Sequence, residues 1–319
     1  MTKLKIFVVL CLIGALCACD GRSRTSDFGI SIEDKRLAQC VDKALRSIYV
    51  ETLEDVKHLR CHAPAIISDY HKVIPHKPLG PGERRPLPVK SIAGLEKLTH
   101  LETLDLSHNL IEEIDLSPFK HLHSAYLRNN LIKEVDLSQN ANLETLDISN
   151  NPLEYIAIGN SSSLQHLDLS AGHDFEDDTV FTFGYAELAG FQLEDFFAGV
   201  SLTGSDALVN VETFKARNRK SLITDFSKLT NLKLLDVRNS DYKHLDLSGN
   251  SGIKDIDASN NPLESINFHD NANVLELKIN ECQFSDLPSS LFQKIKSIKA
   301  DNNNLTMLDM VNSDYRIER

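Results

Sequence analysis

The sequence predicts an α/β solenoid, a horseshoe of 21-residue coils with a parallel sheet along its concave face and a small helical N-terminal cap. Three observations predict this fold: recurring copies of one apolar template from Leu101 onward, a constant spacing between copies within each run, and helix-like apolar spacing ahead of them. A coil this short cannot bury its apolar face alone, so neighbouring coils must stack and share one core.

The template reads apolar, two variable, apolar, one variable, apolar, two variable, asparagine. Its copies begin at Leu101, Leu122, Leu143, Leu164, Val211, Leu232, Ile253, Val274 and Ile295. The apolar positions alternate along a short strand and point inward, while the residues between them face outward. A second apolar pair follows each strand, and so short a coil leaves room only for short extended or 3₁₀ segments on the convex side.

The asparagine column supplies an amide that can satisfy backbone groups where the chain turns out of the strand. Its members are Asn109, Asn130, Asn151, Asn261 and Asn303, with Cys282 in the same slot as a buried structural thiol. The template therefore resembles the leucine-rich-repeat signature, whose period is about 20–29 residues.

Residues 31–63 precede the repeats and predict a helical cap over the first open face of the solenoid. Ser31 and Thr52, each with an aspartate at the third position after it, predict the starts of two helices. Cys40 and Cys61 flank the second predicted helix. In an exported protein, such a pair predicts a disulfide across the cap.

Residues 1–18 predict an export signal, in which Lys3 and Lys5 precede an uncharged run over residues 6–18. That run is shorter than the roughly 20 residues that a spanning helix needs. The sequence Leu-Cys-Ala-Cys ending at Cys19 resembles the lipobox of bacterial lipoprotein precursors. The resemblance implies that Cys19 carries the lipid, palmitate among its acyl chains, and that residues 19–30 form a tether. An ordinary secretory signal without lipid is the alternative.

Location and charge follow from the same segment. Asp20 resembles the inner-membrane retention signal of enteric-type bacteria, which favours the periplasmic side of the inner membrane and leaves the outer membrane open. The chain has 34 Lys plus Arg against 46 Asp plus Glu, a net charge of −12. Removal of residues 1–18, with two Lys, leaves 32 against 46, or −14. This balance excludes general nucleic-acid binding, which needs a basic footprint.

Two segments interrupt the predicted repeats, which occupy residues 91–170 and 211–319. Residues 64–90 hold six of the ten Pro and a run of basic residues, and we favour a tolerated insertion over a loop that docks on an acidic or lipid-headgroup surface. Residues 171–210 hold seven of the 21 aromatic residues behind an acidic cluster. We interpret this insert as degenerate coils, with a flap beside the concave face as the alternative.

The lipobox, the cap with two cysteines, the lead-in at residues 91–99 and the 21-residue repeats together resemble bacterial, internalin-like leucine-rich-repeat lipoproteins. The resemblance covers most of the mature chain. It implies a lipid-anchored recognition protein of the bacterial cell envelope. It does not define the ligand, because members of this group bind many different partners.

The sequence predicts no enzyme and no cofactor, because it contains no Gly-rich phosphate loop and no nucleophile elbow. An aspartate column on the strand face is interpreted as solvated strand residues: Asp105, Asp147, Asp168, Asp236 and Asp257. His100, His121 and His123 are interpreted as exposed histidines rather than metal ligands. An enzyme built on the aromatic insert is not favoured.

The sequence thus predicts a monomer that binds another protein through its concave face. The predicted contact residues are Tyr126, Arg128, Asp147, Lys215, Arg217, Asp236, Arg238, Lys278 and Lys299. Tyrosine and arginine are enriched at protein interfaces, which favours this assignment. The alternative is a structural envelope protein that contacts peptidoglycan or another polysaccharide.

Overall fold

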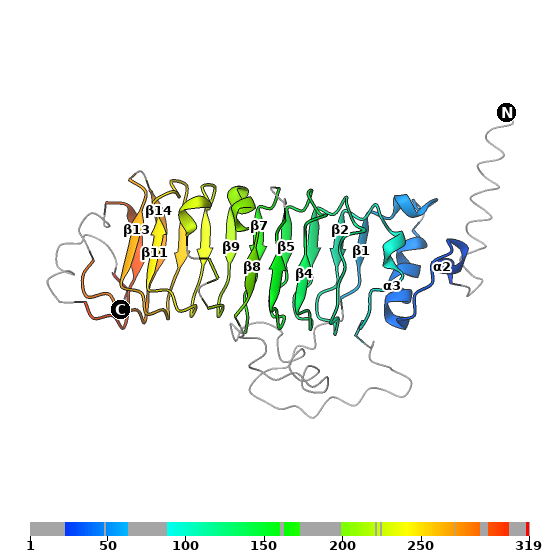
Figure 1. Cartoon of the computed structure of the whole chain (residues 1–319), viewed down its shortest axis with the longest axis horizontal. Coiled ribbons are helices and arrows are strands. Elements are labelled where there is room, and N and C mark those ends of the chain that lie inside the picture. The colour runs from blue at the N-terminus through cyan, green and yellow to red at the C-terminus, as the bar shows by residue number, and fades with distance from the viewer. Residues whose placement is uncertain are drawn as a thin grey trace, which may run out of the picture.

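The computed structural model describes residues 23–47, 49–62, 88–159, 163–172, 199–220, 222–223, 225–270, 272–287 and 293–305, with the backbone of 317–318. Its coils stack into one curved solenoid with the cap at the N-terminal end (Figure 1). An 11-stranded sheet of parallel neighbours runs the length of the solenoid. Its strands are, in order, β1 (His58–Arg60), β2 (Thr103–Asp105), β3 (Ser124–Tyr126), β5 (Thr145–Asp147), β7 (His166–Asp168), β9 (Thr213–Lys215), β10 (Leu234–Asp236), β12 (Asp255–Asp257), β14 (Val274–Lys278), β15 (Ile295–Lys299) and β16 (Ile317–Glu318).

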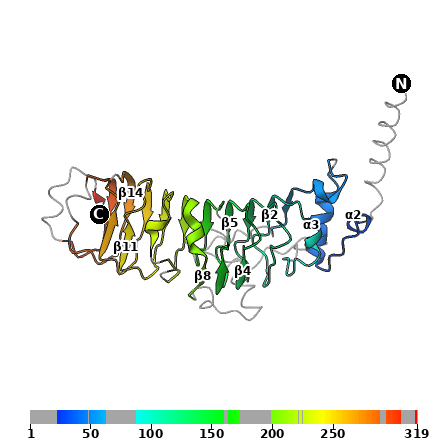
Figure 2. The same ribbon diagram turned by 45° about the horizontal axis from the view of Figure 1, so that its top comes forward.

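The convex side carries short strands and 3₁₀ turns, as the short period predicts. Figure 2 shows β4 and β8 on the opposite side of the solenoid from β2 and β5. The convex strands are β4 (Glu134–Asp136), β6 (Tyr155–Ala157) and β8 (Ser201–Thr203) in one sheet, and β11 (His244–Leu247) and β13 (Ser265–Phe268) in another. The 3₁₀ turns that complete the coils are η2 (Leu95–Lys97), η4 (Ser205–Asn210) and η5 (Phe226–Lys228).

The cap is built on helix α3 (Lys35–Leu45), which buries Leu37, Val41 and Leu45. The helix begins at Asp34, whose carboxylate accepts hydrogen bonds from the backbone N–H groups of Arg36 and Leu37, each at 2.9 Å. The predicted start at Ser31 is therefore wrong and lies almost one turn too early, because Asp34 is itself a strong N-cap.

The predicted tether, residues 19–30, lies partly outside the described residues, and its described part is folded. Helix α2 (Arg24–Asp27) contacts α3, and the Arg24 guanidinium donates to the Leu45 carbonyl at 2.7 Å. Thr25 and Ile30 are buried. These contacts make residues 23–30 part of the cap, so a free tether would have to end before Ser23.

The second predicted cap helix is wrong. Thr52 starts only a short 3₁₀ turn, η1 (Leu53–Asp55), and β1 follows at once and pairs with β2. The reason is the alternation of Val56, Leu59 and Cys61, which point inward like the apolar triplet of a repeat. The solenoid therefore begins one coil earlier than the sequence predicts. The predicted disulfide is present, and it joins α3 to this first coil with the Cα atoms of Cys40 and Cys61 5.6 Å apart.

The asparagine column forms a continuous ladder between coils. The Asn130 amide donates to the carbonyl oxygens of Leu127 in its own coil and Leu106 in the coil before, both at 2.9 Å. Its oxygen accepts from the Ile111 N–H at 3.1 Å. Asn151 and Asn261 repeat this geometry. The ladder satisfies backbone groups that the turn would otherwise bury without partners.

The ladder also locates the two interruptions. In ordinary coils the ladder side chain donates to a carbonyl of the preceding coil 24 residues earlier, as Asn130 does to Leu106. Asn109 instead donates to the Cys61 carbonyl, 48 residues earlier, and Arg219 to the Leu169 carbonyl, 50 residues earlier. Each interruption therefore lengthens a single coil by somewhat more than one repeat. Direct pairing of β7 with β9 agrees, since it leaves no place in the sheet for a degenerate coil. Residues 173–198 of the insert and most of the Pro-rich segment lie outside the described residues, so the flap alternative stays a prediction; the described residues 199–210 contain β8 and η4.

Candidate partner-binding face

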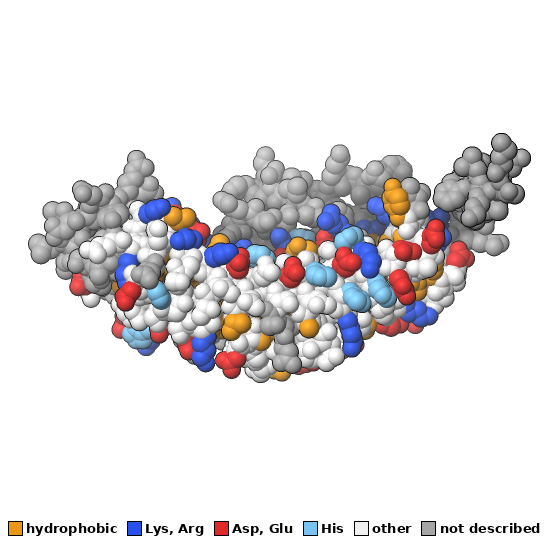
Figure 3. Space-filling view, turned by 90° about the horizontal axis from the view of Figure 1, so that it is seen from above, with side chains coloured by type: hydrophobic (Ala, Val, Ile, Leu, Met, Phe, Trp, Pro, Cys, Tyr) orange, Lys and Arg blue, Asp and Glu red, His pale blue; other side chains and the backbone are white. Residues whose placement is uncertain are grey.

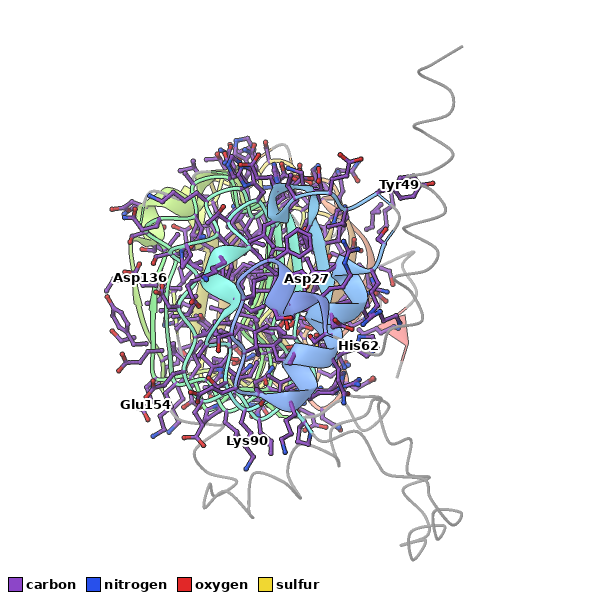
Figure 4. All side chains as sticks on the ribbon, turned by 90° about the vertical axis from the view of Figure 1, so that its right-hand side faces the viewer. Asp27, Tyr49, His62, Lys90, Asp136 and Glu154 are labelled. Carbon is purple, nitrogen blue, oxygen red and sulfur yellow. A yellow bond between two sulfur atoms is a disulfide. The ribbon has the colours of Figure 1, made fainter. Side chains whose placement is uncertain are left out.

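The outward side of the 11-stranded sheet brings together all the predicted contact residues. Figure 4 looks along the solenoid and shows His62 on the concave side, opposite Asp136 and Glu154 on the convex side. Two rows of outward positions run across the coils. The first row, at the last residue of each strand, holds Tyr126, Asp147, Lys215, Asp236, Lys278 and Lys299. The second row, just beyond the strand ends, holds Arg128, Arg217 and Arg238.

The aspartate column is more tightly held than its interpretation as solvated residues predicts. One carboxylate oxygen of each aspartate accepts a hydrogen bond from the backbone N–H of the second residue after it, at 3.1 Å in Asp105 and Asp147 and 3.4 Å in Asp236. This contact ends the strand and turns the chain toward the ladder. Asp236 is only 9% exposed, so the column is a structural feature of the coil first.

In the C-terminal half of the face, the charged side chains pair with one another. Asp236 contacts Arg217 at 3.5 Å and Arg238 at 3.1 Å, and Arg238 also contacts Asp257 at 3.4 Å. A second group follows along the coils: the nitrogen of Lys278 lies 3.1 Å from Glu276, and that of Lys299 lies 3.2 Å from it. Most long cations of this half are thereby oriented along the sheet by intramolecular contacts.

The N-terminal half differs, because one exposed aromatic ring lies among short side chains of the neighbouring strands, with Arg128 two residues further along its own chain segment. Tyr126 is 36% exposed, and its row neighbours in register are Asp105 and Asp147. The adjoining outward row on the same strands holds Thr103, Ser124 and Thr145. Most of the histidines visible in Figure 3 also lie over this half of the molecule.

The histidines of this half stack rather than converge. The rings of His100 and His121 lie 4.9 Å apart with an interplanar angle of 12°. His62 follows β1 and lies 3.6 Å from the Asp105 carboxylate, whereas the exposed His123 immediately precedes β3. Within the described residues, no group of three or more histidine, cysteine or acidic side chains is arranged to hold a metal ion.

Two residues of the ladder were not predicted, because the prediction considered asparagine, or cysteine in its place, at the ladder position of each coil. The slot after β9 holds Arg219, fully buried, and the slot after β10 holds Ser240. Arg219 donates to the Leu169 carbonyl at 2.8 Å and to the Asn151 carbonyl at 2.9 Å. It thus spans the coil whose own slot is Gly172. Burial lowers its pKa to about 10. Counting one repeat back from Ser240 would have found it.

The stacked coils, the parallel concave sheet and the ladder define a leucine-rich-repeat solenoid. The Leucine Rich Repeat family matches the chain at residues 100–122 and 142–162. Proteins of this fold commonly bind protein partners and are typically interaction scaffolds without catalytic activity. Among the described residues, no helix combines the length and apolarity needed to cross a membrane.

Several solved structures are similar to this chain. The LRIM1/APL1C complex shares 16% identity over 71% of this chain and 38% of its own, with a TM-score of 0.49. An internalin of Listeria monocytogenes, InlF, shares 21% identity over 90% of this chain and 91% of its own, with a TM-score of 0.41. YopM from Yersinia enterocolitica shares 20% identity over 65% of this chain and 44% of its own, with a TM-score of 0.41. A search of curated protein sequences finds no match.

Proposed function

We propose that this protein is a cell-envelope recognition protein that binds another protein through the concave face of its solenoid. The observation that supports the proposal is the accessible outward side of the 11-stranded sheet, with Tyr126 and charged side chains set on a fixed backbone. A preformed surface loses little conformational entropy when it binds. Exposed tyrosine and arginine are the residue types that contribute most at such interfaces.

The proposal includes export and lipid anchoring through Cys19, which lies outside the described residues. The lipobox-like sequence supports it, and so does the Cys40–Cys61 disulfide, because such bonds persist in oxidising compartments. The mature net charge of −14, from 32 basic and 46 acidic residues, repels anionic headgroups, so the acyl chains would supply the anchoring. Asp20 favours the inner membrane, which cell fractionation would test.

Mass spectrometry of the mature amino terminus tests the anchor separately from the binding face. Acylated Cys19 is the expected first residue. A free amino terminus, or an unmodified Cys19, would contradict the lipid-anchored part of the proposal and leave the binding face untouched.

Site-specific photocross-linking in cells tests the binding face. A photoreactive residue at Thr145 on concave β5 is compared with one at Tyr155 on convex β6; both side chains are half-buried, so the two probes are matched in exposure. We expect protein adducts from position 145 only. Equal adducts from both positions, or none from position 145, would contradict the proposal. Glycan adducts would instead support a structural role on peptidoglycan or another polysaccharide.

A further inference from the structure

We propose that Tyr126 and Asp147 form a docking site for an arginine side chain of the protein partner. The inference rests on the proposed function and adds the chemistry of one contact. The two halves of the concave face differ in their ion pairs: the aspartates of the C-terminal half contact cations of the sheet, whereas Asp147 in the N-terminal half has no ion pair among the described residues.

The Tyr126 side chain is 36% exposed on the outward side of the sheet. On β3 it is flanked in register by Asp105 of β2 and Asp147 of β5, so an aromatic ring lies between two carboxylates. Neighbouring strands are about 4.8 Å apart, which places all three side chains within reach of one bound group. The adjacent outward residues Ser124 and Thr145 are short and leave the ring accessible.

Asp147 differs from the rest of the aspartate column. Asp105 contacts Arg60 at 3.4 Å, Asp168 contacts Lys215 at 3.7 Å, and Asp236 and Asp257 share Arg238. In the part of the chain that the structure describes, no ion pair joins Asp147 to a cation. One of its oxygens accepts from the Ser149 hydroxyl at 2.6 Å, which leaves the other oxygen for an external donor.

The electrostatic surroundings of Asp147 favour an added positive charge. Burial raises the pKa of this carboxyl, and the negative charge of Asp168 on the next strand raises it further. The Ser149 hydrogen bonds and the charge of Arg128 act in the opposite direction without cancelling the effect. A cation bound beside Asp147 would offset both the cost of burying the charged carboxylate and its repulsion from Asp168.

Arginine fits this site better than lysine for two reasons. Its planar guanidinium stacks on an aromatic face, and its fork of N–H donors matches a carboxylate. Tyr126 offers the face and Asp147 offers the carboxylate on the adjacent strand. A lysine ammonium is a compact, strongly hydrated charge and would use one of these features at a time.

A titration with N-acetyl-arginine amide, followed by NMR on the labelled protein, tests the site. We expect saturable shifts confined to Tyr126, Asp147 and their strand neighbours. Asp147→Asn should weaken binding roughly fivefold to tenfold, because it removes a charge-assisted hydrogen bond. The matched control is Asp246→Asn on convex β11, where the carboxylate accepts from the Ser248 N–H at 3.0 Å in the same geometry. That variant should bind as the wild type does.

The neutral isostere N-acetyl-citrulline amide separates charge from shape, and we expect it to cause no saturable shift at the site. Equal binding of the citrulline compound, or unchanged binding by Asp147→Asn, would overturn the inference. Loss of binding in Asp246→Asn would do so as well. These outcomes do not depend on cross-linking at position 145, so the docking site can fail while the proposed function stands.

Discussion

Replacing Asn130 by alanine tests the claim that the ladder holds the coils together. The substitution removes two donated hydrogen bonds at 2.9 Å, to the Leu106 and Leu127 carbonyls, and a longer one at 3.4 Å to the Arg128 carbonyl. It also removes the hydrogen bond accepted from the Ile111 N–H at 3.1 Å. Asn130 is fully buried. A buried polar group without a partner costs about 1–3 kcal/mol. Only the Ile111 N–H is left without a partner among the described residues, because Asn109 still donates to the Leu106 carbonyl at 2.8 Å and Asn151 to the Leu127 carbonyl at 3.0 Å. Adding about 0.5–1.5 kcal/mol for the hydrogen bond that each of these two carbonyls loses gives an expected total loss of about 2–6 kcal/mol.

The matched control for this variant is Asn142→Ala. Asn142 is exposed and donates to the Lys120 carbonyl at 3.0 Å, so its loss should cost about 0.5 kcal/mol. Asn130→Cys should fall between the two, because the Cys282 sulfur in the same slot keeps weak contacts with the Ala258 carbonyl at 3.4 Å and the Asn280 carbonyl at 3.5 Å. Urea unfolding followed by far-ultraviolet circular dichroism measures all three free energies, since the chain has no Trp.

The expected order of unfolding free energies is wild type, Asn142→Ala, Asn130→Cys, then Asn130→Ala. An Asn130→Ala variant within about 1 kcal/mol of the Asn142 control would refute the ladder argument, because it would mean that losing the buried Asn130 hydrogen bonds costs little. A cysteine variant no more stable than the alanine variant would refute the assignment of Cys282 as a ladder residue.

Three further predictions follow from individual contacts. Reduction of the Cys40–Cys61 disulfide, which closes a loop with a sequence separation of 21, should lower the unfolding free energy by about 3 kcal/mol in urea titrations with and without reductant. Arg238→Ala should cost about 1–3 kcal/mol in the same assay, because Asp236, only 9% exposed, loses one of its two cations. Asp147→Asn should raise the unfolding free energy by about 0.2–1 kcal/mol at pH 7, because it removes the repulsion between the Asp147 and Asp168 carboxylates on adjacent strands. Because the folded-state pKa of Asp147 is raised, that gain should shrink as pH falls through this pKa and the wild-type carboxyl takes up a proton.

The stacking of coils was predictable because the repeat has a constant step. Residues one repeat apart lie side by side, so Tyr126 had to neighbour Asp105 and Asp147 once the register was known. The ion pairs of the C-terminal half follow a related offset, since the sequence separation of Arg217 from Asp236 equals that of Arg238 from Asp257. This constant separation is visible in the sequence. Whether the side chains meet depends on their conformations across the two outward rows, which the sequence does not define.

The start of the solenoid was harder to predict, because its first coil is interrupted. Val56, Leu59 and Cys61 match the inward positions of a repeat, but the next described residue of this coil after His62 is Pro88, and Val89 makes the ladder contact, donating to Asn109 at 2.8 Å. The second interruption misled in the same way. The distance from Leu164 to Val211 fits worn coils as well as one enlarged coil, and the pairing of β7 with β9 and the contact of Arg219 with Leu169 distinguish them.

The two halves of the concave face illustrate how stability and binding compete for the same charges. In the C-terminal half, Asp236 is held by two arginines, so a partner that approached either of them would first have to break a contact within the sheet. In the N-terminal half, Asp147 is left beside Asp168 without an ion pair among the described residues, at a cost to the free protein. An Asp147 variant that is more stable and yet no longer binds arginine would therefore separate the binding role of Asp147 from a folding role. If the residue were present only for folding, its replacement would lower the stability of the protein.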